Sequence, residues 1–322
     1  MIEVVKKGFE TSIQDYPGRI GFWNQGFPPS GPMDSWSFRL ANLLVGNAPG
    51  AAGLEAQFLG PTLRFGEDTV IAVCGASMAP TLDGAPLPMW ESVAVKAGQT
   101  LALKAATVGA RAYIAVAGGF ANAPWLGSQS TFHVAGIGGI EGHAIQDGQK
   151  LPVNAGKGTP GRKVKAEAMP PISSDKSWTI EVCEGPNDDW IDAPGKERFL
   201  TTPWKLSGKS ARTGYRLDGP QWTFSDKAYN KAPENGSEPS NIIDQGYPLG
   251  GINLAGQTPI ILLHDGCSMG GFICPYTVPT CAFWKLGQAK PGDTLRFRLV
   301  SVEEAQALRR QLDAVASAAS IA

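Results

Sequence analysis

Short apolar runs that end in turn residues recur along the whole chain and limit the folds open to it. Examples are TVIAVCGA, RAYIAVAGGF, WTIEVCEG, TPIILLHDG and DTLRFRLV. Each is rich in β-branched residues or alternates in polarity, which is typical of strands. Glycine followed by Gln or Asp precedes a strand-like run in VKAGQTLAL, IQDGQKLPV and AKPGDTLRF, as in tight β-turns. The 40 glycines and 25 prolines follow no period, which indicates many turns between short strands. The sequence therefore predicts mostly antiparallel β structure in barrels or sandwiches.

One helix is predicted directly after an unusually stiff loop. In WSFRLANLLVGN, apolar side chains at i, i+4, i+7 and i+8 from Trp36 form one face of a helix. Asp34 can cap its first turn and Gly46 can end it. The preceding PPSGPM contains three prolines, which fix φ and remove three backbone donors. The loop therefore serves either to start the helix or as a rigid wall of a site.

The chain of 322 residues divides at a segment with linker composition. Residues 154–177 are rich in Gly, Pro, Lys and Ser and poor in large apolar side chains. The predicted domains are an N-terminal β-barrel lobe over 1–153 and a C-terminal lobe over 178–300. A helical tail over 301–322 follows, with one apolar stripe formed by Ala305, Leu308, Leu312 and Val315.

Composition excludes some classes of partner. Lys plus Arg total 28 against 29 Asp plus Glu, so no electrostatic reason exists to expect nucleic acid or an acidic membrane. No apolar run is long enough to span a bilayer, and the N-terminus lacks the apolar core of a signal peptide, so we expect a cytoplasmic protein. Cys267, Cys274 and Cys281 are evenly spaced, but only His264 lies nearby. We expect reduced thiols and no metal.

Motifs of self-contained catalysis are missing. The sequence has no phosphate-binding G-x-x-x-x-G-K-[ST], no H-E-x-x-H and no G-x-S-x-G. The glycine-dense GIGGIEG at 136–142 lacks the strand and helix that a nucleotide site needs. The three histidines are interpreted as structural or surface residues. Nothing here marks an enzyme that works alone.

Six longer segments together resemble one family. They are TSIQDYPGRIGFWNQGFPPSGPMDSWSFRLANLLVGN, GLEAQFLGPTLRF, RTGYRLDGP, PSNIIDQGY, DGCSMGGFICPYTV and WKLGQAKPGDTLRF. They are similar to the biotin-dependent carboxyltransferase family of the allophanate hydrolase subunit 2 type. That family includes part of the carboxyltransferase domain of urea carboxylase and the C-type subunit of the ATP-dependent 5-oxoprolinase. The Y-P-G-R and GGFICP…WKLGQ segments resemble the urea carboxylase branch more. The resemblance implies a mainly β fold of two cyclophilin-like β-barrel lobes with a few short helices and a C-terminal helix.

The resemblance also implies that the chemistry is shared with other proteins. Family members work beside a partner of the allophanate hydrolase subunit 1 type. In urea carboxylase, a biotin carboxylase loads CO2 on biotin, and a carrier delivers the carboxybiotin. This chain has no A-M-K-M biotin-attachment motif, so we expect partners to supply the biotin carboxylase and the biotin carrier.

The function that follows is that of a carboxyltransferase subunit of a multi-subunit biotin-dependent urea or amide carboxylase. It would move the carboxyl group from carboxybiotin to a urea-like nitrogen. One alternative is the C-type subunit of an ATP-dependent 5-oxoprolinase, which hydrolyses a lactam. Another is a regulatory binding subunit that acts on a partner kinase.

The matching motifs supply the candidate site residues. The candidate catalytic residues are Asp15, Asn241, Asp265 and Ser268. The candidate substrate- or biotin-binding residues are Ser30, Met33, Asp34, Arg212, Arg216, Glu238, Ser240, Gly270 and Gly271. Carboxyl transfer needs donors for a developing oxyanion, a base, and a dry pocket that holds the acceptor.

Most of these residues also allow a structural interpretation. Asp34 is a base candidate or a helix cap. The two arginines of RTGYR, four residues apart, could bind a carboxylate as a fork or form surface salt bridges. The glycine pair in SMGGF lets the backbone approach a ligand or forms a β-bulge, and PSN offers a hydroxyl and an amide or an Asx turn.

Two positions depart from the family pattern. Glu238 stands where H-P-S-N is usual, and Cys267 stands where D-G-P-S is usual. A carboxylate at 238 would repel an anionic acceptor, so we expect a small neutral or cationic one.

Overall fold

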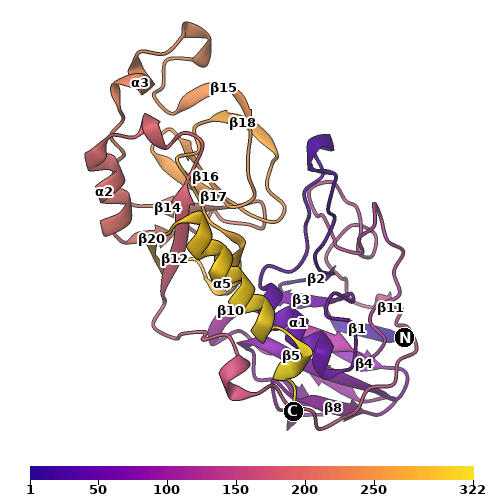
Figure 1. Ribbon diagram of the computed structural model, residues 1–322. Helices are drawn as coiled ribbons and strands as arrows, with labels where there is room; N and C mark the ends of the chain where they lie inside the picture. Colours follow the sequence, from indigo (N-terminus) through magenta and orange to yellow (C-terminus); the bar gives the residue numbers. More distant parts are fainter. The chain divides into compact units, whose positions relative to one another are not determined.

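The computed structural model describes residues 1–322, which form two compact units (Figure 1). The first unit comprises Met1–Ile20, Pro29–Ser173 and Gln311–Ala322, and the second comprises Gly21–Pro28 and Ser174–Arg310. The first unit thus contains most of the expected linker at 154–177, and the domain limits drawn from the sequence stay a prediction. No helix in the chain is long and apolar enough to cross a membrane.

The first unit consists of two antiparallel sheets and a helix. The first sheet has the order β11-β1-β4-β9-β6-β7, with β1 (Ile2–Lys6), β4 (Thr62–Phe65), β6 (Thr81–Leu82), β7 (Ala85–Pro86), β9 (Thr100–Ala102) and β11 (Lys150–Leu151). The second has the order β2-β3-β10-β5-β8, with β2 (Glu10–Gln14), β3 (Gly53–Gln57), β5 (Thr69–Ser77), β8 (Ser92–Val95) and β10 (Val108–Val116). Apolar side chains of both sheets, among them Val4, Leu63, Leu54 and Ile114, form one core cluster.

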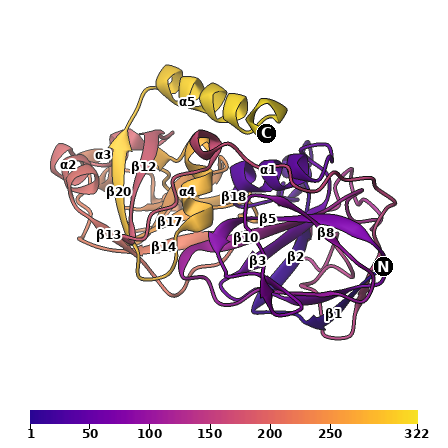
Figure 2. The same ribbon diagram turned by 90° about the horizontal axis from the view of Figure 1, so that it is seen from below.

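Helix α1 (Ser35–Leu44) covers part of the second sheet of the first unit (Figure 2). Leu40 and Leu44 of the predicted apolar face are buried against side chains of β5 and β10, whereas Trp36 and Leu43 are only partly buried. Phe38, which the predicted face did not include, is buried in the same cluster. Gly46 ends the helix in the left-handed conformation, at φ 81°. Two 3-10 turns, η2 (Ala166–Ala168) and η6 (Ala318–Ser320), complete the unit.

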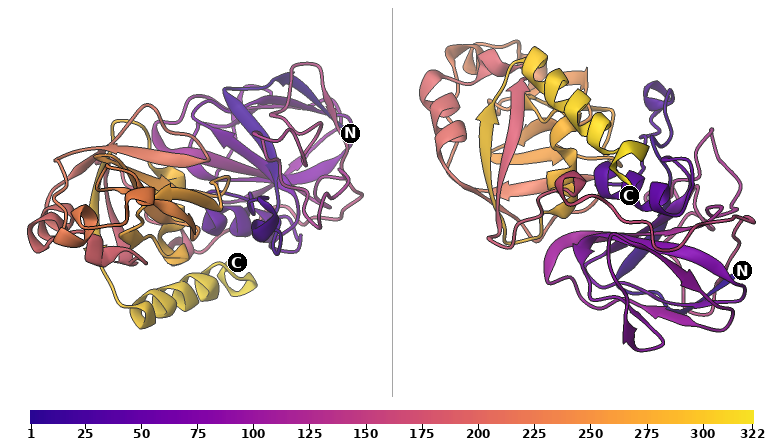
Figure 3. Two further views of the ribbon diagram at one scale, coloured as in Figure 1. Left: turned by 90° about the horizontal axis from the view of Figure 1, so that it is seen from above. Right: turned by 60° about the horizontal axis from the view of Figure 1, so that its bottom comes forward.

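The second unit contains a closed seven-stranded barrel. Its order is β12-β19-β16-β17-β14-β13-β20, with β12 (Ser177–Glu184), β13 (Trp204–Leu206), β14 (Gly214–Asp218), β16 (Gly251–Ala255), β17 (Thr258–Leu262), β19 (Tyr276–Thr277) and β20 (Thr294–Leu299). β12 and β20 pair in parallel (Figure 3). Phe199 of α2 (Ala193–Thr201) stacks on Tyr276 and Phe297, and its ring centroid lies 4.5 Å and 4.4 Å from theirs. Aromatic packing of this kind stabilises the barrel interior.

The remaining elements of the second unit lie outside the barrel. β15 (Asn241–Gly246) and β18 (Met269–Phe272) form a separate two-stranded sheet. The helices are α3 (Asp226–Tyr229), α4 (Phe283–Gln288) and α5 (Val302–Val315), with 3-10 turns η1 (Trp23–Gln25), η3 (Asp188–Trp190), η4 (Pro233–Asn235) and η5 (Thr280–Ala282). α5 confirms the expected C-terminal helix, and its residues after Arg310 are counted with the first unit.

The mainly β fold predicted from the sequence is confirmed in detail at its turns. Gly98, Gly148 and Gly292, from the three repeated turn patterns, have φ of 89°, 79° and 91°. Each precedes a strand, namely β9, β11 and β20. A Cβ atom at these glycines would meet nothing within 4 Å. The glycines are therefore needed for their left-handed backbone and not for lack of space.

Candidate functional site

One face of the second sheet in the first unit is polar where a core would normally be apolar. Glu10 on β2 pairs with Gln57 on β3, which pairs with Arg111 on β10. The next row on the same face contains Ser12, Glu55 and Tyr113, because side chains alternate along a strand. Gln14 continues this face along β2. We call these residues the polar face: Glu10, Ser12, Gln14, Glu55, Gln57, Arg111 and Tyr113.

A buried ion pair lies at the centre of the polar face. The side chains of Arg111 and Glu55 are 1% and 3% exposed, and Arg111 Nε lies 3.4 Å from Glu55 Oε1. Arg111 Nη2 donates to Gln57 Oε1 at 2.8 Å, and Tyr113 Oη donates to Glu55 Oε2 at 2.9 Å. Burial, and then the negative charge of Glu55, raises the pKa of Tyr113 well above its usual value. The phenol therefore stays protonated and keeps its donor role.

The stiff loop Pro28–Asp34 is attached to the polar face through its backbone. Gly31 N–H donates to Gln14 Oε1 at 3.0 Å, and Met33 N–H donates to Glu55 Oε2 at 2.7 Å. Asp34 N–H donates to Tyr113 Oη at 2.8 Å. The three prolines of the loop have no N–H group that needs an acceptor. The three N–H groups named above are each bonded to a side chain from a different strand, and these bonds hold the loop.

Ser30, in the middle of this loop, has two unfavourable features. Its φ is 53°, in the left-handed region that side chains other than glycine rarely adopt. The residue is completely buried, and its Oγ has no hydrogen-bond partner. A buried polar atom without a partner costs about 1–3 kcal/mol, and a left-handed backbone costs a further amount of similar order.

Asp34 is the N-terminal cap of α1, and Met33 beside it is buried. Asp34 Oδ1 accepts from the N–H groups of Trp36 and Ser37, both at 3.0 Å, and Oδ2 accepts from Ser37 Oγ at 2.5 Å. The structure thus shows the capping role that the sequence left open. The binding role that the motif suggested for Asp34 stays a prediction.

Replacing Asp34 by alanine is expected to lower the free energy of unfolding by about 1–2 kcal/mol, because two helix N–H groups lose their acceptor. Asp34→Asn is expected to lose less than half of that, since an amide oxygen can still accept. Denaturation in guanidinium chloride measures both. Equal losses in the two variants would contradict the capping role.

Asp15 and Arg19 of the IQDYPGR segment brace a neighbouring loop. Asp15 accepts from Ser128 Oγ, Gln129 N–H and Ser130 Oγ at 2.5, 2.7 and 2.5 Å. Arg19 is buried, donates from Nη2 to the Ser130 carbonyl at 2.9 Å and lies over the ring of Trp125. Both oxygens of Asp15 are thus engaged within the chain. A role as base remains a prediction that this geometry does not favour.

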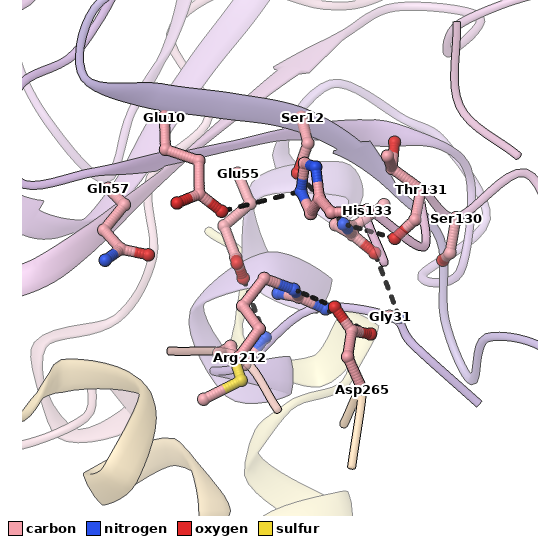
Figure 4. A network of polar contacts seen from close by, with 12 residues as sticks. Glu10, Ser12, Gly31, Glu55, Gln57, Ser130, Thr131, His133, Arg212 and Asp265 are labelled. Carbon is pink, nitrogen blue, oxygen red and sulfur yellow. Dashed lines mark hydrogen bonds and ion pairs between the residues drawn. The ribbon is translucent and has the colours of Figure 1, made fainter. Parts of the chain in front are cut away.

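His133 and Glu10 form the partly exposed end of the polar face. His133 Nε2 lies 3.5 Å from Glu10 Oε1, and the two side chains are 25% and 34% exposed (Figure 4). Sequence reasoning assigned this histidine a structural or surface role and did not single out the polar face. A usable signal existed in Glu55 and Arg111, which are charged residues inside otherwise apolar strands.

In the second unit, the structure joins two of the predicted site residues. Arg212 Nε donates to Asp265 Oδ2 at 2.9 Å, and the two side chains are 4% and 2% exposed. Arg216 does not join them, because it is an exposed residue of β14 whose neighbours Tyr215 and Leu217 point into the barrel. A fork shared by the two arginines stays a prediction, because Arg212 lies in the turn before β14 and Arg216 is exposed on that strand.

The PSN segment lies at the start of β15. Ser240 is buried, and its Oγ accepts from Gly256 N–H at 3.1 Å. Lys231 Nζ donates to the backbone carbonyls of Glu238 and Asn241, and burial lowers the pKa of Lys231. The Glu238 side chain is exposed. Its influence on an acceptor is therefore screened by solvent more than the sequence suggested.

The glycine pair of SMGGF is on β18. A Cβ atom at Gly270 would lie 2.6 Å from the ring of Tyr247, whose hydroxyl accepts from Phe272 N–H at 2.7 Å. A Cβ atom at Gly271 would lie 3.0 Å from the Ile242 carbonyl. Packing alone thus requires glycine at 270, so the pair does not by itself indicate a ligand.

Two candidate residues of the second unit keep their polar groups unused. The side chains of Asn241 and Ser268 are partly exposed and make no hydrogen bond within the chain.

No group of three or more His, Cys, Asp or Glu side chains is placed to hold a metal ion.

Comparisons with known proteins agree on one family. Residues 25–299 match the family described as "Carboxyltransferase domain, subdomain A and B". Urea amidolyase of Saccharomyces cerevisiae is 40% identical over 97% of this chain and 17% of its own length. The C-type subunit of 5-oxoprolinase from Escherichia coli is 32% identical over 96% of this chain and 94% of its own. The crystal structure of Kluyveromyces lactis urea carboxylase matches with a TM-score of 0.93 and 39% identity, over 98% of this chain and 29% of that one. The chain therefore spans less than a third of the urea-processing relatives.

Proposed function

Because the chain belongs to the carboxyltransferase domain family, we propose that it is the carboxyltransferase component of a biotin-dependent urea or amide carboxylase. The observation that carries the proposal is the 40% identity to urea amidolyase along 97% of the chain, against 32% to the 5-oxoprolinase relative. The reaction would transfer the carboxyl group of carboxybiotin to a nitrogen of a small, uncharged urea-like acceptor. Carboxybiotin supplies the activated carboxyl group when it is bound.

The polar groups that the chain leaves unused fit a urea-type group. In the second unit, Asn241 and Ser268 have a partly exposed amide and a partly exposed hydroxyl that make no hydrogen bond within the chain. Urea and the ureido ring of biotin both present a carbonyl beside N–H groups, which such side chains can bond. Among the predicted catalytic residues we therefore favour Asn241 and Ser268 as groups that bind and orient the reactants. Asp15 and Asp265 are engaged in structural contacts.

The rigid loop Pro28–Asp34 suits a positioning role in such a site. Its backbone is fixed by prolines and by three sheet acceptors, so little freedom is left to lose when a reactant binds. This supports the interpretation of the loop as a preorganised wall.

Partners are also part of the proposal. The matching region makes up 17% of the yeast urea amidolyase chain, and the E. coli relative is by name one subunit of a larger enzyme. We propose that this chain works with an allophanate hydrolase subunit 1 type partner, a biotin carboxylase and a biotin carrier, and that it is inactive without them.

A second candidate function is supported by a different observation. The chain is 32% identical to the E. coli 5-oxoprolinase relative over 96% of its residues, so its similarity is not confined to urea-processing proteins. A subunit of an ATP-dependent 5-oxoprolinase would need no biotin.

The test is to purify the chain alone and in complex with the proteins encoded beside it, and to measure urea-dependent ATP hydrolysis and bicarbonate fixation. The complex is expected to be active and to lose activity when avidin blocks biotin, while the chain alone is folded and inactive. Avidin-insensitive cleavage of 5-oxoproline by the complex would overturn the proposal in favour of the second candidate. Turnover of urea by the chain alone would exclude the dependence on partners.

A further inference from the structure

We propose that Phe9, Phe58 and Leu59 form the surface on which the chain binds its partner of the allophanate hydrolase subunit 1 type. The segment of the partner that covers them carries apolar side chains flanked by Asp or Glu. We call the three residues the aromatic patch. The inference rests on the proposed function for the identity of the partner, and none of the three residues is among the candidate site residues.

The aromatic patch is apolar surface that the fold of the first unit leaves uncovered. Phe9 and Leu59 are 62% and 45% exposed, and Phe58 is partly buried. The rings of Phe9 and Phe58 lie together, with centroids 5.7 Å apart. Leu59 adjoins them, because its carbonyl accepts from Phe9 N–H at 2.9 Å. Single exposed apolar side chains are normal, but a group gathered from two segments is typical of a binding surface.

The backbone that presents the Phe58 ring is rigid and uncommon. Phe58 has a φ of 60°, which is rare for a bulky residue, and Leu59 N–H donates across it to the Gln57 carbonyl at 2.6 Å. Phe58 N–H donates to the Ala110 carbonyl at 2.8 Å, and its own carbonyl accepts from Ala106 N–H at 2.7 Å. A ring fixed in this way loses little freedom when a partner covers it.

Positive charge that the fold does not use flanks the aromatic patch. Lys104 lies beside Leu59, since its carbonyl accepts from Gly60 N–H at 3.3 Å. Lys6, at the end of β1, lies three residues before Phe9. Both lysines are exposed, and neither side chain forms an ion pair or hydrogen bond within the chain. Acidic side chains around an apolar segment of the partner therefore complement this surface.

The acidic groups of the same region are engaged within the chain. Glu10 Oε1 lies 3.5 Å from His133 Nε2, and Asp147 Oδ1 accepts from Lys7 N–H at 2.8 Å. A second copy of the chain is thus a poor occupant, because a two-fold contact at the patch brings the lysines of both copies together. A biotin carrier is also a poor occupant, because it must leave after each transfer and lasting interfaces are the more hydrophobic ones.

The test measures the kinetics of binding between the chain and the purified partner subunit by biolayer interferometry. Phe9→Ser and Leu59→Ser are each expected to raise Kd by about 10- to 100-fold, mainly through faster dissociation, as the loss of a central apolar contact does. Lys104→Glu is expected to lower the association rate by about 3- to 10-fold and to weaken its dependence on salt, because charges at the rim act on the encounter.

Two matched controls and a measurement without mutation accompany these variants. Val302→Ser changes an apolar residue of α5 that is 57% exposed, and Lys157→Glu changes an exposed lysine that forms no ion pair within the chain. Both controls should keep Kd within about 2-fold of wild type, since neither residue is in the patch. Hydrogen exchange of the wild-type complex should show protection at residues 8–10 and 57–60.

Each outcome of this test has a distinct meaning. Wild-type binding by both Phe9→Ser and Leu59→Ser, no protection of the patch, or no binding of the partner by wild type would overturn the inference. Self-association of the chain that Phe9→Ser abolishes in sedimentation velocity would overturn it in favour of a second copy.

The proposed function is tested separately, by urea-dependent ATP hydrolysis of the full complex. If binding depends on the aromatic patch but the wild-type complex does not turn over urea, the proposed function fails and the binding surface is supported. If the complex is active and binding does not depend on the patch, the inference alone fails.

Discussion

An Arg111→Met variant is expected to lose about 3–5 kcal/mol of unfolding free energy, because Glu55 would be left as a buried charge without this counter-ion. Glu55 is 3% exposed and pairs with the Arg111 guanidinium, whereas Tyr113 Oη and Met33 N–H, which also bond its carboxylate, are uncharged donors. The loss should be measured by guanidinium chloride denaturation, since urea is a proposed substrate.

Two further variants show whether the buried charge is the cause of this loss. The double variant Arg111→Met, Glu55→Gln should recover at least half of it, because an amide oxygen can still accept from Met33 and Tyr113. Arg64→Met is the matched control, since Arg64 pairs with Glu3 at the surface with 53% and 44% of the side chains exposed and should change stability by less than about 0.5 kcal/mol. A double variant as unstable as the single one would contradict the explanation.

In the second unit, Arg212→Met is expected to have an effect of similar size, about 3–5 kcal/mol. The Arg212–Asp265 pair is as well buried as the pair in the first unit, and its Nε–Oδ2 distance of 2.9 Å is shorter. Denaturation followed by tryptophan fluorescence measures the change. Arg216→Met, four residues later and exposed on β14, provides a control that should stay within about 0.5 kcal/mol.

The same experiment bears on the predicted role of Asp265 as a catalytic residue. If Arg212→Met is as stable as wild type, the pair does not hold the fold, and the carboxylate is available for other work. A large loss would identify the pair as structural, and a base would then have to be sought elsewhere in the site.

The sequence shows, as motifs, which segments belong to the candidate site. It does not show what the individual side chains of those segments bind. The IQDYPGR and PPSGPMD segments stand out as unusual from their residues alone. The structure shows that Asp15 and Asp34 use their carboxylates to brace a loop and to cap a helix. A motif records that residues are needed at a spacing, and contacts made with distant residues decide what each one does.

The sequence by itself determined the local structure. Strands, the glycine turns before β9, β11 and β20, the capped helix α1 and the C-terminal helix follow from patterns within a few residues of one another. Only the tertiary structure decided which polar side chains meet. Glu55 and Arg111 are far apart in the sequence and share a face because β3 and β10 pair in one register, and a shift by one residue would turn them to opposite faces. That register depends on the packing of the whole sheet, which no local pattern encodes, and it determines the polar face that holds the loop Pro28–Asp34 in place.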